Sequence, residues 1–133
     1  MAKRDSKGNS TTKRGRFFAL QHHMMNSEAW RSLTPQEVAV YLRVAYRFNG
    51  VNNGHLALGV RDAAREAKVS RNTAAKALLN LSEKGLLKRM VLGGYSTNGG
   101  KATTYALTCL PICKGKAASR EYQAWKPSLK NKT

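Results

Sequence analysis

The stretch from residue 68 to residue 87, KVSRNTAAKALLNLSEKGLL, combines an apolar periodicity with start and stop signals for a single helix. Its apolar side chains recur at the spacing of one buried helix face, namely Ala74, Ala77, Leu78 and Leu81. Ser70 stands in front of them as a helix N-cap, and Gly85 stands where helices commonly end. We therefore predict a helix over residues 70–84.

The segments on either side of this helix have different patterns. RDAAREA at residues 61–67 predicts a shorter helix, and Val69 in the intervening turn can pack in front of the apolar stripe. Beyond Gly85 the period changes toward two, and LLKRMVL and ATTYALT are rich in strand-forming residues around a Gly-rich polar tip, GGYSTNGGK. We therefore predict a β-hairpin over residues 86–108.

A third helix is expected upstream, because TPQE at residues 34–37 is a strong start signal. Thr34 is a good N-cap, Pro35 fits the first helical position, and Glu37 completes a capping box. The helix should continue to about Phe48, where NGVNNG supplies the Asn and Gly residues that end helices. Two smaller elements are a short helix capped by Ser27 and a strand across HLALGV.

Helix 35–48 is apolar almost all round, and only Arg43 and Arg47 mark a polar stripe. We expect one face to be formed by Val38, Leu42 and Ala45, with Tyr41, Val44 and Phe48 beside it. Such a wide apolar surface indicates burial on two sides. The helix is therefore either central in the domain and covered by residues 17–33, or partly in contact with another subunit.

The composition indicates a small basic protein with a polyanionic partner. The chain has 133 residues, 41% of them hydrophobic, and 24 Lys and Arg against 7 Asp and Glu, for a formal charge of +17. Nucleic acid is the expected partner, and an anionic membrane surface is the competing interpretation. No run approaches the roughly 18 apolar residues of a membrane span, and no signal-peptide core follows the basic start.

The charge is concentrated at the two ends of the chain. Residues 1–16 and residues 109–133 each carry a net charge of +5. The predicted division is a disordered basic arm at 1–16, one folded domain at 17–110, and a basic tail at 111–133. The tail is expected to hold a short helix near residues 119–125, with Tyr122 and Trp125 docking it onto the domain.

Two cysteines, Cys109 and Cys113, are too few for a disulfide framework, which favours a reduced, cytoplasmic protein. Their spacing together with His22 and His23 would permit a zinc site, but the adjacent histidines make joint chelation awkward. We therefore predict two thiols without a metal, and we expect no cofactor.

The order of helix, three-residue turn, helix and hairpin resembles that of winged helix-turn-helix proteins over residues 34–108. RDAAREAKVSRNTAAKALLNLSEKGLL is similar to the DNA-binding segments of GntR-type and MarR-type regulators and of plasmid and phage replication proteins. The positions that fit are Ala64, Val69, SRNT at 70–73, and the Leu81, Gly85 and Leu86 ending. Lys68 departs from the pattern, because many such turns have Gly there.

This resemblance implies an α+β, mainly α fold: a three-helix core with a C-terminal hairpin wing and basic arms at both ends. WRSLTPQEVAVYLRVAYRFNG further resembles the leading helices of replication-initiator-type winged helices. The resemblance implies that the helix at 70–84 of this chain is the recognition helix. It also implies that the hairpin at 86–108 lies along the DNA backbone or the minor groove.

The candidate DNA contacts follow from the helix face opposite the apolar stripe. Arg can bond two acceptors of guanine and Asn can do the same for adenine, while the small Ala75 allows close approach to a groove. The outward set is Arg71, Asn72, Lys76 and Asn80. Phosphate contacts are expected from Ser70 and Thr73 at the helix start and from Arg61 and Arg65 on the preceding helix. The hairpin adds Lys88, Arg89, Tyr95, Thr97, Asn98 and Lys101, and the arm adds Arg14 and Arg16.

The predicted function is sequence-specific binding of double-stranded DNA, in the cytoplasm and associated with the nucleoid when bound. The protein would be a transcriptional regulator that binds a palindrome as a homodimer, or a replication or excision accessory protein of a mobile element. RNA remains a second nucleic-acid candidate. The alternative is a protein-docking module that uses helix 35–48 and the aromatic tail.

An enzyme is not expected. The seven acidic residues are scattered, and the sequence has no P-loop and no nucleophile elbow. His55 has no Ser, Cys or acidic partner at a useful spacing.

Overall fold

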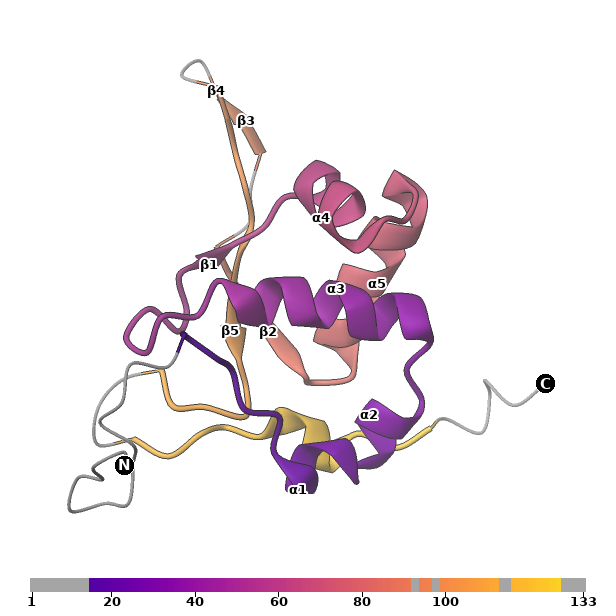
Figure 1. Cartoon of the computed structure of the whole chain (residues 1–133), viewed down its shortest axis with the longest axis vertical. Coiled ribbons are helices and arrows are strands. Elements are labelled where there is room, and N and C mark those ends of the chain that lie inside the picture. The colour runs from indigo at the N-terminus through magenta and orange to yellow at the C-terminus, as the bar shows by residue number, and fades with distance from the viewer. Residues whose placement is uncertain (1–14, 92–93, 97–98, 113–115, 128–133) are drawn as a thin grey trace.

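Figure 1 shows the computed structural model of the chain, which describes residues 15–91, 94–96, 99–112 and 116–127. Within these residues the fold is α+β and mainly helical, with an antiparallel sheet beside the helices. The helices are α1 (His22–Met25), α2 (Glu28–Arg31), α3 (Pro35–Tyr46), α4 (Val60–Ala67), α5 (Arg71–Glu83) and a 3₁₀-helix, η1 (Glu121–Ala124). The strands are β1 (Leu56–Ala57), β2 (Leu87–Val91), β3 (Gly94–Ser96), β4 (Gly99–Lys101) and β5 (Thr104–Leu107).

The start of α3 confirms the predicted capping box. The Thr34 hydroxyl accepts from the Glu37 backbone N–H at 3.2 Å, and the Glu37 carboxylate accepts from the Thr34 N–H at 2.8 Å. Ser27 caps α2 as expected, since its hydroxyl accepts from the Trp30 N–H. Helix α1 was not predicted, because HHMM has no side-chain cap, yet it buries Met24 completely.

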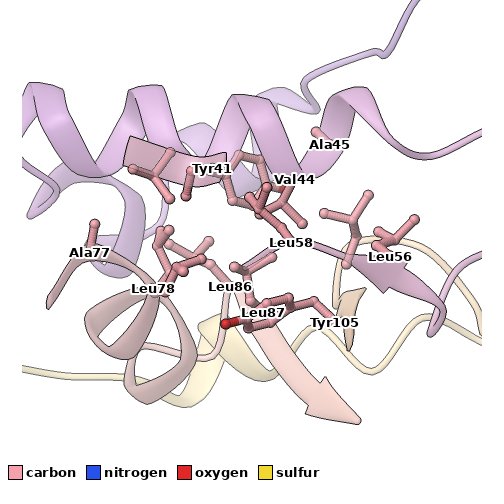
Figure 2. Close-up of a cluster of buried hydrophobic side chains, with 14 of the residues drawn as sticks. Tyr41, Val44, Ala45, Leu56, Leu58, Ala77, Leu78, Leu86, Leu87 and Tyr105 are labelled. Carbon is pink, nitrogen blue, oxygen red and sulfur yellow. The ribbon is translucent and has the colours of Figure 1, made fainter. Parts of the chain in front are cut away.

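The buried face of α3 agrees only in part with the predicted one, because it contains Tyr41, Val44 and Ala45 but not Leu42. Its fully covered apolar side chains are Val40, Tyr41, Val44 and Ala45. Leu42, which we expected beside Ala45, is 41% exposed. When a helix is apolar almost all round, its sequence does not show which face is buried. The elements that pack against it decide which side is covered. Figure 2 shows Tyr41 and Val44 pointing from α3 toward Leu78, Leu86 and Leu87.

Helices α4 and α5 are joined by a tight turn, as the sequence predicts. Lys68 adopts a left-handed conformation with φ 60° and ψ 46°, which suits glycine better than a residue with a Cβ. Ser70 then caps α5 by accepting from the Thr73 N–H at 3.1 Å. The predicted core stripe of α5 is confirmed, because its buried residues are Ala74, Ala77, Leu78 and Leu81.

The predicted hairpin is confirmed, and it contains two pairs of strands, β2 with β5 and β3 with β4. Strands β2 and β5 pair antiparallel, and β1 adds to the other edge of β5 to give the order β1-β5-β2. A register shift between Arg89 and Val91 interrupts this ladder, and Val91 pairs with Thr104 after it. Beyond it β3 and β4 pair with each other, and they carry the hairpin outward from the sheet (Figure 1). HLALGV contributes only the two residues of β1.

The C-terminal tail packs onto the domain, so the folded part extends beyond residue 110. Tyr122 in η1 is completely buried, and its hydroxyl lies 3.0 Å from Nδ1 of His23 in α1. The Arg120 N–H donates to the Thr108 carbonyl at 2.7 Å. The Lys84 ammonium lies 5.3 Å from the Trp125 ring centroid. The predicted docking of the tail through Tyr122 and Trp125 is therefore confirmed.

An ion cluster links α3 to α4. Glu66 accepts from Arg43 at 3.0 Å and from both terminal nitrogens of Arg47, at 2.9 and 2.6 Å. The hydrogen bonds from Arg47 do most to lower the pKa of Glu66 to about 2, although partial burial opposes the shift. Because this pKa is depressed in the folded chain, the stabilisation is present above about pH 4.5, the ordinary value, and is lost as the pH falls toward 2.

We therefore expect Glu66→Gln to be less stable than the wild type at pH 7 by about 1–2 kcal/mol, after allowance for solvent screening. The difference should shrink between pH 4.5 and pH 2, because the wild-type carboxylate becomes protonated. Urea unfolding of both proteins at several pH values measures this. A difference that stays constant down to pH 2 would show that the cluster does not stabilise the fold through its charge.

Candidate nucleic-acid interface

Helix α5 presents an exposed face opposite its buried stripe. Arg71, Asn72, Ala75 and Lys76 are all exposed, as the helical spacing predicts. Leu79 is also 44% exposed, and it follows Ala75 by one turn. The sequence leaves the side of Leu79 open, because Leu78 precedes it directly and Leu81 follows two residues later. Its place four residues after Ala75 is the signal that could have found it.

The two hydroxyls at the start of α5 bond to each other as well as to the backbone. The Ser70 hydroxyl donates to the Thr73 hydroxyl oxygen at 2.9 Å while it caps the helix. Ser70 is exposed and Thr73 is half-buried. The first N–H groups of a helix have no intrahelical acceptor, so this exposed end offers donors to an anion such as a phosphate.

Asn80 differs from the prediction, because it does not belong to the exposed face. Its amide donates to the Glu37 carboxylate at 2.8 Å, and Glu37 is itself buried in α3. The same carboxylate lies 3.9 Å from the Lys84 ammonium. Asn80 therefore joins α5 to the start of α3. The sequence could not show this, since the two residues are 43 positions apart.

The two arginines of α4 lie on its exposed side. Arg61 and Arg65 are both exposed. Arg65 pairs with Asp62 at 3.1 Å and lies 3.9 Å from Glu66, but its side chain remains 71% exposed. Surface pairs of this kind are weak and are screened by salt, so a phosphate can compete for the guanidinium.

The hairpin supplies charge at its base. Lys88 and Arg89 are exposed on β2. Tyr95 lies in β3 and Lys101 in β4, whereas Thr97, Asn98 and Arg14 lie outside the described residues. In Figure 1 the outer part of the hairpin and helix α4 extend to the same side of α3. A long ligand on that side could meet the hairpin and the α4–α5 pair together.

Arg16 is placed at a different part of the molecule. It is exposed, and its guanidinium donates to the Phe48 carbonyl just beyond the end of α3. Helix α5 meets the other end of α3 through Asn80 and Glu37. The two ends of this 12-residue helix are about 16 Å apart. The structure therefore does not bring Arg16 to the exposed face of α5.

Neither cysteine nor histidine forms a metal centre in the described part of the chain. Among those residues no three His, Cys, Asp or Glu side chains lie close enough to share an ion. Cys109 is buried beside the Tyr41 hydroxyl, 3.7 Å away, and burial raises the pKa of its thiol. Cys113 lies outside the described residues. The helices that the structure describes include none with the length and apolarity needed to cross a bilayer.

No family model, curated protein or solved structure matches this chain.

Proposed function

We propose that the chain is a winged helix-turn-helix protein that binds double-stranded DNA, with α5 as its recognition helix and the β2–β5 hairpin as its wing. The single observation that carries the proposal is the exposed face of α5. There Arg71, Asn72 and Lys76 surround the small Ala75, while the opposite face is buried. The element order from α3 to β5 and the formal charge of +17 support the same conclusion.

The exposed face of α5 has the chemistry that sequence recognition in a major groove requires. A B-DNA major groove admits one α-helix, and its base edges present donors, acceptors and thymine methyl groups. Arg71 can bond two guanine acceptors, and Asn72 can pair with an adenine edge. Ala75 allows close approach, and Leu79 offers an apolar contact to a thymine methyl. Specificity is therefore assigned to this face.

Affinity is assigned mainly to contacts with phosphates. The α5 N-terminus with Ser70 can receive one phosphate, and Lys88 and Arg89 at the hairpin base can receive others. Arg61 and Arg65 lie on α4, the other helix of the pair, and are further candidates for phosphate contacts. Because phosphate contacts release counterions, this part of the binding should weaken steeply as salt rises.

The biological setting that we propose is a DNA-bound cytoplasmic protein. It would be a transcriptional regulator, as a homodimer on a palindromic site, or a replication or excision accessory protein of a mobile element. No catalytic step is proposed. The tail does not serve as an alternative protein-docking surface through Tyr122, because that ring is completely buried.

Fluorescence anisotropy with a pool of random duplexes and duplexes from the protein's own locus tests the proposal. Across a salt series, the wild type should retain a preference for one duplex when non-specific binding has been suppressed. Equal binding to all duplexes, disappearing together as salt rises, would show that the charge is only a general tether and would contradict the proposal.

Removal of residues 1–16 should separate affinity from specificity. These residues carry six Lys and Arg against one Asp, so their loss should weaken binding to every duplex. The slope of log K against log salt should fall by as much as about 5. The preference among duplexes should stay nearly unchanged. A control of the same length, with those six residues replaced by glutamine, should behave like the truncation. Loss of preference in either protein would contradict this division of roles.

A further inference from the structure

A second surface, at the far end of α3 from the Asn80–Glu37 contact, combines exposed aromatic rings with arginines. A cavity of about 460 Å³ is lined by Arg16, Phe17, Phe18, Ala45, Tyr46, Arg47 and Phe48. Phe17 is 75% exposed and Tyr46 is 69% exposed. We call this the aromatic cavity. None of these lining residues is acidic.

The base of the aromatic cavity is fixed to the core. Phe18 and Phe48 are half-buried, pack against the core cluster, and meet edge to face with their ring centroids 6.4 Å apart. Arg16 bonds to the Phe48 carbonyl at 3.3 Å. The Arg43 guanidinium lies 4.5 Å from the Tyr46 ring centroid, which holds that ring from one side. The ring of Tyr46 is therefore held on one side, and Phe17 directly precedes Phe18, which packs against the core.

The charge around the aromatic cavity limits what can occupy it. Arg47 and Arg43 are bound to Glu66, so this group of three keeps one net positive charge, and Arg16 adds another. A second copy of the chain would place the same arginines opposite each other, and each copy carries +17. An occupant with negative charge and flat apolar groups fits this surface better. Unpaired nucleotides have both, and proteins bind them by stacking bases on aromatic rings beside cations.

We propose that the aromatic cavity binds single-stranded nucleic acid, with Phe17 and Tyr46 stacking on bases and Arg16 contacting the adjoining phosphate. The site is separate from the exposed face of α5. The same protein could therefore hold a duplex with one surface and an unpaired strand with the other. Because stacking needs only the face of a base, this site should show little sequence preference.

The test compares two labelled 12-nucleotide probes, an oligothymidylate and an abasic strand with the same phosphates, at a salt concentration that suppresses charge-driven binding. The wild type should bind the oligothymidylate more tightly than the abasic strand. Tyr46→Ala should weaken oligothymidylate binding by about tenfold, and Phe17→Ala should act similarly. Tyr46→Phe should restore the binding, because it keeps the ring. Leu42→Ala is the matched control, since Leu42 is exposed on α3 but does not line the cavity.

Equal binding of the two probes by the wild type would overturn the proposal, and so would a Tyr46→Ala protein that binds oligothymidylate normally. Self-association of the wild type in light scattering that Tyr46→Ala abolishes would also overturn it, by showing a protein-contact surface. Duplex binding is measured on the same samples. Tyr46→Ala should leave duplex preference unchanged, and Arg71→Ala should leave oligothymidylate binding unchanged, so this proposal and the duplex proposal can fail independently.

Discussion

Replacing Gly85 with alanine should destabilise the protein by about 3 kcal/mol or more, because two separate costs act on one added methyl group. Gly85 has φ +79°, a left-handed conformation in which L-residues are strained. A Cβ there would lie 2.6 Å from the Glu121 carbonyl carbon and 2.8 Å from both the Glu121 oxygen and the Tyr122 nitrogen. These are backbone atoms, so η1 would have to move and the burial of Tyr122 would be lost.

Gly50 provides a matched control for the conformational part of this cost. Its φ is +104°, yet a Cβ there would meet nothing within 4 Å. Gly50→Ala should therefore cost only about 1 kcal/mol. Urea unfolding of both variants gives the comparison, and the difference between them measures the packing of η1 against the end of α5. Equal losses for the two variants would show that the tail contributes little to the stability of the domain.

The double substitution Arg71→Ala/Lys76→Ala should reduce the preference for the best duplex over random duplexes by at least about tenfold. Both side chains are exposed on α5, so their loss should leave the fold and its stability nearly unchanged. The change at position 71 should remove two hydrogen bonds that the Arg71 guanidinium is expected to make with a guanine. The measurement is the ratio of the dissociation constants for the two duplexes at one salt concentration.

A control with the same charge change separates recognition from general electrostatics. Arg31 and Lys116 are exposed and lie outside α4, α5 and the hairpin. Arg31→Ala/Lys116→Ala should weaken binding to all duplexes slightly and leave the ratio unchanged. An equal loss of preference in both double variants would mean that α5 does not recognise the sequence.

The elements that the sequence predicts well are those whose signals are local. Thr34 and Ser70 stand within three residues of the N–H groups that they cap, and Gly85 ends its helix through its own backbone freedom. The α5 stripe is equally local, because Ala74 and Leu81 face the core at helical spacing with polar residues between them. The exposed set of Arg71, Asn72 and Lys76 follows from the same spacing.

The features that the sequence does not predict depend on contacts between distant residues. Asn53 belongs to the segment NGVNNG, which was expected only to end the helix before it, and it is 2% exposed. Its amide donates to the carbonyls of Leu107 and Leu110, and its oxygen accepts from the Leu107 N–H. The pairing of Asn80 with Glu37 is of the same kind. In each case a short polar side chain completes a long-range hydrogen-bond set, and local composition contains no sign of the partner.

Backbone amide NMR of the 14.7 kDa protein, with the preferred duplex added at elevated salt, tests the central claim most directly. If α5 enters the major groove, the largest shift changes should fall on residues 70–79 and on the hairpin, and the amides of α2 should change little. Large changes around Tyr46 and Phe17 with α5 unaffected would contradict the claim, because duplex DNA would then be held by the aromatic cavity and not by α5.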